Sequence, residues 1–149
     1  GGIIKDGAKL VNAVANSVVP KFTIIMGNSY GAGNYAMCGK AYDPRQIYAW
    51  PTANIAVMGG SQAARTMLTI REAALEKSGE KITAERRAEM LAEIQAKYES
   101  TTTPTYAAAR LWVDGIITPS DTRRHISQGI AIADHVEAIP DLRTGVFQV

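Results

Sequence analysis

The residues best suited to chemistry lie between Lys21 and Met37, in the segment KFTIIMGNSYGAGNYAM. A β-rich apolar run at residues 22–26 stops at Gly27, and the chain then passes through Gly31-Ala32-Gly33 into a segment that can be helical. Small residues leave the backbone N–H groups of such a helix start open to a ligand, and the helix dipole adds to the attraction for an anion. The junction therefore predicts an oxyanion hole built from backbone amides.

A second junction of the same kind is Met58-Gly59-Gly60-Ser61, where Ser61 is the expected helix N-cap. Neither junction is a phosphate motif, because no Lys-Ser/Thr pair completes a P-loop and Gly31-Ala32-Gly33 lacks the later glycine of a dinucleotide fingerprint. Tyr30 and Tyr35 flank the first turn and are candidates either for pocket walls or for ordinary packing. Tight packing also explains one glycine turn by itself, but two such junctions in one chain favour a binding role.

Side-chain catalysts are scarce in this sequence. Ser29 does not lie in a G-x-S-x-G elbow, and His125 follows Asp121 on what is predicted to be a single helix. Cys38 has the setting of a small buried residue rather than of a nucleophile. An enzyme with a prepared amide pocket but no evident acid or base should act on a substrate or cofactor that brings its own base. Enolate chemistry meets that requirement.

The composition is that of one globular domain of 149 residues, with 46% hydrophobic and 20% charged residues. A net charge of +2, with basic residues interleaved with acidic ones, argues against a nucleic-acid binder. One cysteine and two histidines make neither a disulfide nor a metal-ligand set, and no apolar run is long enough to cross a bilayer. We therefore expect an intracellular, metal-free protein without a membrane span. The chain opens on Gly1-Gly2 without a methionine, so we also expect it to be part of a longer polypeptide.

Periodicity and breakers predict one α/β domain over residues 1–149, with ββα units and an inserted helical excursion. We expect the excursion at residues 63–100, interrupted at Ser78-Gly79, with Ala84, Ala88, Leu91 and Tyr98 on the packed side of its second helix. The other expected helices follow Ile4 up to Pro20, residues 106–112 and residues 120–135, and the expected extended segments are residues 22–26, 46–50 and 53–58, with a turn at Asp114-Gly115.

Three segments of the chain, in order, closely resemble the β subunit of biotin-dependent acyl-CoA carboxylases. They are GGIIKDGAKLVNAVANSVVPKFTIIMGNSYGAGNYAMCGKAYDPR, YAWPTANIAVMGGSQAA and ARLWVDGIITPSDTR, and the nearest branches are methylcrotonyl-CoA carboxylase and geranyl-CoA carboxylase. The resemblance spans essentially all 149 residues, which correspond to the C-terminal half of that subunit. It implies a crotonase-like (ClpP/crotonase) fold and a carboxyltransferase C-terminal domain, whose N-terminal acyl-CoA-binding partner domain is absent from this sequence.

In that family, consecutive amides of the glycine turn bind the ureido oxygen of biotin, and these amides fall here on Ala32 and Gly33. Their neighbours in the implied pocket are Tyr30, Gly31, Asn34, Tyr35, Gly59 and Gly60. The resemblance further implies CO₂ transfer from carboxybiotin to an acyl-CoA, biotin carried by a partner α subunit, and no metal in this domain. It also implies a homo-oligomer assembled through crotonase domains, in the bacterial cytoplasm or the mitochondrial matrix, with this fragment inactive alone.

Departures from the family pattern concern the substrate rather than the amides. Thr118 stands where relatives usually carry Asp, and Asn28 and Ala36 stand where methylcrotonyl-type members often have glycine. These differences leave the identity of the acyl group open between methylcrotonyl-type and other chains. Two other functions also stay open from the residues: a stand-alone crotonase-type hydratase, isomerase or thioesterase, and a non-catalytic assembly module that uses residues 63–100.

Overall fold

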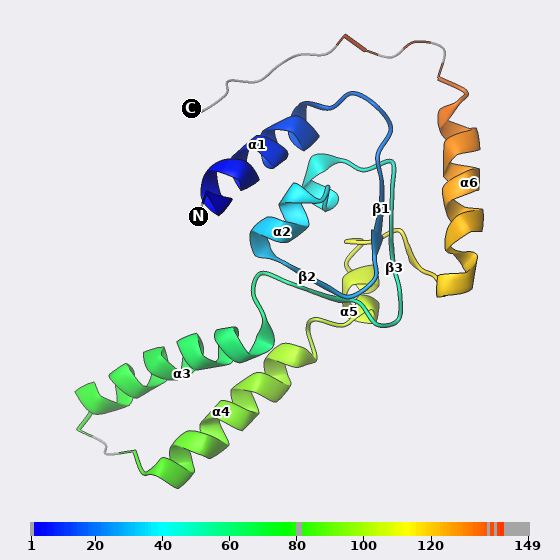
Figure 1. The fold of residues 1–149 in the computed structure, drawn as a ribbon. Coiled ribbons are helices and arrows are strands. Elements are labelled where there is room, and N and C mark those ends of the chain that lie inside the picture. Colours follow the sequence, from blue (N-terminus) through cyan, green and yellow to red (C-terminus); the bar gives the residue numbers. More distant parts are fainter. Residues whose placement is uncertain (1, 80–81, 137, 139, 142–149) are drawn as a thin grey trace.

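The computed structural model describes residues 2–79, 82–136, 138 and 140–141. Its strands are short, and helices account for most of its regular secondary structure (Figure 1). The helices are α1 (Ile3–Asn16), α2 (Gly31–Ala36), α3 (Gly60–Lys77), α4 (Ala84–Glu99), α5 (Pro104–Ala109) and α6 (Thr122–Ala133). The strands are β1 (Phe22–Ile25), β2 (Asn28–Tyr30), β3 (Gln46–Ala49), β4 (Asn54–Ala56) and β5 (Gly115–Ile116), and single 3₁₀ turns lie at Lys40–Tyr42 and Pro119–Asp121.

The strands form two small parallel sheets. The first has the order β1-β3-β5, and the second pairs β2 with β4, with Tyr30 opposite Ala56. The backbone pairing of β4 extends to Gly27, the residue before β2, whose carbonyl accepts from the N–H of Asn54 at 3.1 Å. In the second sheet α2 follows β2 directly, and α3 follows β4 after a short link, so both helices begin at the carboxyl end of that sheet.

Two of these strands were absent from the sequence-based prediction. β2 interrupts what we expected to be one glycine turn, and β5 occupies the turn expected at Asp114-Gly115. β2 has three residues and β5 has two, and each exists through its pairing with a distant strand. The predicted strand at residues 22–26 and the extended segments at residues 46–50 and 53–58 are confirmed by β1, β3 and β4.

The main hydrophobic core lies between the sheets and α5. Its buried members are Ile25, Ile47, Ala49, Ala53, Ile55, Ala107 and Val113. α5 begins at Pro104, where the Thr103 hydroxyl accepts a hydrogen bond from the N–H of Tyr106, so this helix starts two residues earlier than expected. This core includes Ile55 of β4 and therefore fixes the strand that precedes α3.

The predicted helical excursion is confirmed, and it forms a hairpin of α3 and α4 that projects away from the strands (Figure 1). Its own small core consists of Ala64, Leu68, Met90 and Ile94. The predicted stripe on α4 is confirmed at Leu91, which packs against this core, and at Tyr98, which is partly buried. It is wrong at Ala84 and Ala88, which are exposed, and it misses Met90 and Ile94, the buried residues of that helix. Alanine contributes little apolar area, so the larger side chains decide which face packs.

Two hydrogen bonds connect the end of α4 to β4 and to the chain that follows β4. The Tyr98 hydroxyl donates to the carbonyl of Met58 at 2.9 Å, close to the start of α3. At the end of α4 the carbonyl of Thr102 accepts from the N–H of Ile55 at 2.8 Å. These contacts set where the N-terminus of α3 lies relative to β4.

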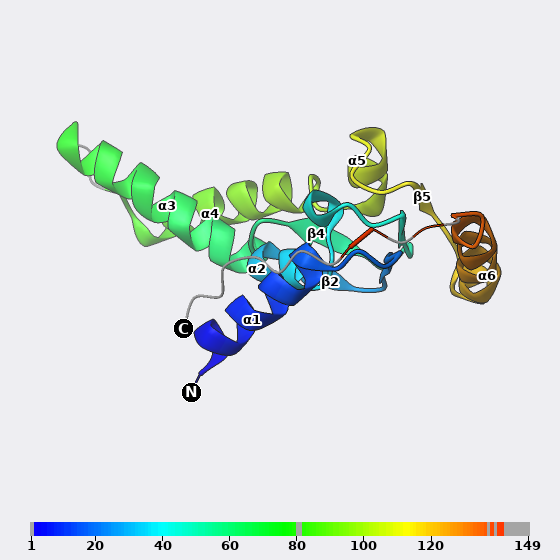
Figure 2. The ribbon, with the colours of Figure 1, turned by 90° about the horizontal axis from the view of Figure 1, so that it is seen from above.

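α6 lies at the opposite end of the molecule from the hairpin (Figure 2). It packs closely on β1, because a Cβ at Gly129 would lie 2.6 Å from Cε1 of Phe22. The Trp50 indole N–H donates to the Thr122 hydroxyl at 2.9 Å and fixes the start of the helix. The predicted last helix is thus confirmed, although its first residues form the 3₁₀ turn Pro119–Asp121.

α1 ends before Pro20, as predicted, and its C-terminal carbonyls bind a lysine. The Lys21 ammonium donates to the carbonyls of Val14 at 2.9 Å and Ser17 at 3.3 Å. A cation at this end of a helix also complements the helix dipole. Among the residues that the structure describes, no helix has the length and apolarity required to traverse a bilayer.

Candidate functional site

The glycine turn between β2 and α2 requires glycine at Gly31. This residue has a φ of 49°, in the left-handed region that disfavours side chains. A Cβ there would also lie 2.7 Å from the carbonyl oxygen of Val57, which follows β4. The turn can therefore approach β4 as closely as it does because Gly31 carries no side chain.

Ala32 and Gly33 lie in the first turn of α2, and both are exposed. The first N–H groups of a helix have no partner within it. Within the described part of the chain, neither N–H donates to a backbone or side-chain acceptor outside the helix. A Cβ added at Gly33 would meet no atom within 4 Å. The two adjacent amides are thus available to a ligand oxygen, as an oxyanion hole requires.

The second junction places Gly59 at the N-cap of α3 and Gly60 as its first residue. The prediction that Ser61 caps this helix is wrong: α3 begins two residues earlier than such a cap implies and has no side-chain cap. Gly59 lies beside Tyr30, since a Cβ at Gly59 would be 3.7 Å from Cε2 of the tyrosine ring. The two junctions are therefore neighbours in space, because β2 and β4 are paired.

The residues expected to form one pocket divide between two concave surfaces. Tyr30 and Gly60 border a polar cavity of about 390 Å³ that Asn54, Gln95 and Glu99 also line. Gly31, Asn34 and Tyr35 border a second cavity of about 340 Å³, whose floor consists of the core residues Ile25, Ile47 and Ile55. Its volume lies in the range of small-ligand pockets, about 300 to 1,000 Å³.

Two residues of this second cavity had no signal in the sequence. Lys40 and Trp112 line it together with α2. The Lys40 ammonium lies 3.4 Å from a carboxylate oxygen of Asp114, so this cation is paired at the cavity's edge. Both Trp112 and Asp114 lie more than 70 positions from the turn, and only the fold brings them to it.

Tyr35 and Asn34 have different surroundings on α2. The Tyr35 ring is 48% exposed and contacts Tyr42 edge to face, with ring centroids 5.8 Å apart. The side-chain amide of Asn34 instead donates to the Ser29 hydroxyl at 2.8 Å. Tyr35 is thus free to contact a ligand, whereas the Asn34 nitrogen already has a partner on β2.

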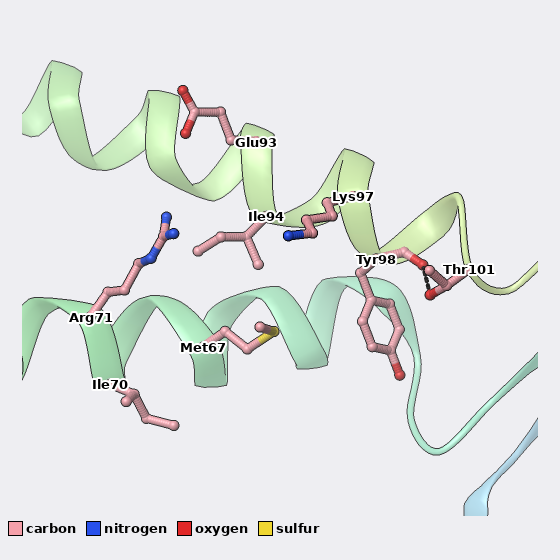
Figure 3. Close-up of a pocket in the computed structure, with 8 residues that line it drawn as sticks. All are labelled: Met67, Ile70, Arg71, Glu93, Ile94, Lys97, Tyr98 and Thr101. Atoms are coloured by element: carbon pink, nitrogen blue, oxygen red, sulfur yellow. Dashed lines mark hydrogen bonds between the residues drawn. The ribbon is translucent and has the colours of Figure 1, made fainter.

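A separate groove of about 470 Å³ lies between α3 and α4 (Figure 3). Ile94 of α4 points toward α3 there, and Arg71 of α3 points toward α4. None of the predicted site residues lines this groove, so it does not belong to the turn. Over the residues that the structure describes, no three His, Cys, Asp or Glu side chains are grouped as a metal site would require.

The sequence matches the carboxyl transferase domain family over residues 1–146. It is 46% identical, over all of its 149 residues, to the biotin-dependent 3-methylcrotonyl-coenzyme A carboxylase beta1 subunit of Mycobacterium tuberculosis, of which it covers 28%. It is also 46% identical over 148 residues, 99% of this chain, to the probable mitochondrial methylcrotonoyl-CoA carboxylase beta chain of Drosophila melanogaster, of which it covers 25%. The chain thus spans about a quarter of the length of these relatives.

The fold matches solved structures of the same kind. The geranyl-CoA carboxylase beta subunit of P. aeruginosa superposes with a TM-score of 0.79 at 42% identity, over 99% of this chain and 27% of that one. Transcarboxylase 12S, solved with methylmalonyl-coenzyme A and methylmalonic acid bound, gives a TM-score of 0.82 at 35% identity, over 100% of this chain and 27% of that one. The expected crotonase-like fold is therefore confirmed. The chain belongs to the carboxyl transferase domain family.

Proposed function

We propose that this chain is the C-terminal, biotin-facing domain of the β subunit of an acyl-CoA carboxylase, which transfers CO₂ from carboxybiotin to an acyl-CoA. The observation that carries the proposal is the pair of exposed amides at Ala32 and Gly33, which have no acceptor outside the helix within the described residues. The names of the relatives support a 3-methyl-enoyl thioester such as methylcrotonyl-CoA as the acceptor. Geranyl-CoA is the alternative that a structural neighbour suggests.

The amides of Ala32 and Gly33 are suited in kind to the ureido oxygen of biotin, because two adjacent N–H donors can bind one negatively charged oxygen. When bound, carboxybiotin would supply CO₂ and a ring nitrogen able to act as a base. The N–H groups of Ala32 and Gly33 would donate to the ureido oxygen, and these hydrogen bonds would strengthen as negative charge moves onto that oxygen. Because the start of α2 already holds them in place, they stabilise this charge without reorganising. One donor of this kind is worth about 2.7 to 4 kcal/mol.

The rest of the active site would lie outside this chain. Tyr35, Met37 and Val57 are exposed near the turn, at 48%, 70% and 78%, so the amides are open to water here. Water weakens charge stabilisation, and a covered site would therefore be needed for catalysis. We propose that an acyl-CoA-binding domain and a biotin-carrying α subunit complete the site, in an oligomer located in the bacterial cytoplasm or the mitochondrial matrix. The chain alone should be inactive.

The test removes one donor at Gly33 in the full β subunit, assembled with its α subunit. Gly33→Pro deletes the N–H at a first-turn position where the helix does not use it. Proline also disfavours the helical conformation of Ala32. A second variant therefore replaces Gly33 with glycolate, which turns the peptide bond between residues 32 and 33 into an ester and so removes the N–H without adding bulk. Both should lower kcat for carboxylation about 10² to 10³-fold.

Gly33→Ala keeps the N–H and adds one carbon in open space, so its kcat should fall much less. Assembly and the thermal midpoint are measured for each variant. Near-normal turnover of the glycolate variant would remove the amide from its role. Hydration of an enoyl-CoA by the purified subunit, without biotin, would instead favour the crotonase-type hydratase.

A further inference from the structure

α2 is too short to hold itself in place. It has six residues, whereas isolated helices shorter than about 12 residues are marginal in water. None of its residues is buried, so apolar packing contributes little to its position. The orientation of the Ala32 and Gly33 amides must therefore depend on the contacts of α2 with α1 and on specific bonds between α2 and the strands.

One such bond joins the middle of α2 to β2. The Asn34 side-chain nitrogen donates to the Ser29 hydroxyl at 2.8 Å, and both residues are partly buried. Ser29 itself is paired with Ile55 in the two-stranded sheet. The bond therefore connects the turn of α2 that follows the amides to a strand on the opposite side of the glycine turn.

A second set of contacts holds the other end of α2. The Gly39 N–H donates to the Asn34 carbonyl at 2.8 Å, and the Thr23 hydroxyl of β1 donates to the carbonyl of Cys38 at 2.8 Å. Gly39 also packs directly on Asn34, because a Cβ there would lie 2.8 Å from both Cγ and the carbonyl oxygen of Asn34, and closer still to Oδ1. Asn34 thus lies at the centre of the contacts that connect α2 to both sheets.

We infer that Asn34, through its bond to Ser29, is a positioning residue that aims the Ala32 and Gly33 amides, rather than a residue that touches the ligand. This inference rests on the proposed function. The Asn34 amide nitrogen is already engaged with Ser29, and Gly39 covers its oxygen. A loss of the bond would let α2 tilt about the glycine turn, and a misplacement of 1 Å in a catalytic group can cost about 100-fold in rate.

A matched pair of variants at Ser29 isolates the bond. Ser29→Thr keeps the hydroxyl, whereas Ser29→Val has the same shape without it. Both are made in the full β subunit assembled with its α subunit, and Asn16→Leu serves as a control that removes a similar side-chain bond, to Asn12, on α1. The readouts are kcat, KM for acyl-CoA and the thermal midpoint.

We expect Ser29→Val and Asn34→Leu each to lower kcat about 10- to 100-fold, with KM for acyl-CoA within about twofold. Ser29→Thr should recover most of the kcat lost in Ser29→Val, and the double variant Ser29→Val/Asn34→Leu should be no slower than either single one. A purely structural role would instead lower the thermal midpoint and the amount of assembled enzyme while leaving kcat of the assembled enzyme intact.

The inference is overturned if Ser29→Val keeps kcat within about twofold of Asn16→Leu, or if the losses at the two positions multiply. If Asn34→Leu does not assemble, the comparison of Ser29→Thr with Ser29→Val decides alone, because these two variants differ only by one hydroxyl in place of one methyl group. The glycolate variant at Gly33 separates the two proposals. A glycolate variant with normal turnover rejects the proposed function itself, whereas a slow glycolate variant with a normal Ser29→Val rejects only the role of Asn34.

Discussion

Gly31→Ala should destabilise the glycine turn by two separate costs. A residue with a Cβ in the left-handed region, at the observed φ of 49°, costs about 1 to 2 kcal/mol. The new carbon would also lie 2.7 Å from the Val57 carbonyl oxygen, a backbone atom that cannot rotate away. Either α2 or the end of β4 must shift, and overpacking of this kind costs about 1 to 3 kcal/mol.

One effect of alanine acts in the opposite direction. Alanine restricts the backbone of the unfolded chain more than glycine does, which offsets about 0.4 to 1 kcal/mol of the destabilisation. The net local cost is therefore about 1 to 5 kcal/mol, centred near 3 kcal/mol. Because about 1.4 kcal/mol corresponds to a factor of ten, opening of α2 should become roughly two orders of magnitude more frequent.

Hydrogen exchange of the α2 amides in the full subunit measures this local opening directly. Gly27→Ala is the matched control, since it lies just before β2, has no left-handed φ, and its Cβ would meet no atom within 4 Å. The control should leave exchange within about a factor of three of the parent. If Gly31→Ala exchanges no faster than Gly27→Ala, the close approach of the turn to β4 is not what holds it, and our account of Gly31 is refuted.

Two further predictions concern the α3–α4 hairpin. Leu68→Ala should lower the free energy of unfolding by about 2 to 5 kcal/mol, because Leu68 is only 3% exposed. Ile70→Ala, on the exposed face of α3, should lower it far less. Equal losses for the two variants in urea titrations would contradict the hairpin core. The Glu85 pKa is lowered by a hydrogen bond from its own backbone and by one from Thr83 at the start of α4. The ionised Glu85 carboxylate therefore stabilises the folded state. This stabilisation is complete above the ordinary pKa of 4.5 and is lost as the pH falls through the lowered pKa. Glu85→Gln should abolish this acid dependence of the thermal midpoint, and an unchanged pH profile would count against it.

The local features of the fold could be predicted from the sequence because their signals are local. The apolar run at residues 22–26 and the glycines after it predicted β1 and a helix start. The break at Ser78 was also predictable, since glycine follows it and good helix formers surround it. The glycine turn that contains Ala32 and Gly33 could be found in the sequence for the same reason, whereas the role of these two amides follows from the resemblance to the carboxylase family and stays a prediction.

Features that depend on pairing between distant segments could not be predicted in this way. β5 has two residues, and its sequence Gly115-Ile116 has no strand pattern, so only its place beside β3 makes it a strand. The packed face of α4 was predicted correctly at Leu91 and Tyr98 but not at Ala84 and Ala88, because spacing alone cannot tell an alanine stripe from a stripe of larger side chains. Likewise, Trp112 reaches the cavity beside α2 through the chain that follows α5.

The two helix starts at the carboxyl end of the second sheet differ in how they are held. α3 has 18 residues, its own packed core with α4, and a base fixed by Tyr98, so its N-terminus is stable without help from the glycines. α2 has neither length nor buried residues, and its position depends on its contacts with α1, on the Ser29–Asn34 bond and on the contacts of Gly31 and Gly39. A ligand oxygen bound by the α2 amides would therefore add to the stability of the segment that binds it, since binding to the ordered state stabilises that state. Hydrogen exchange of α2 should consequently slow when a biotin-carrying partner is bound, and the exchange of α3 should change little.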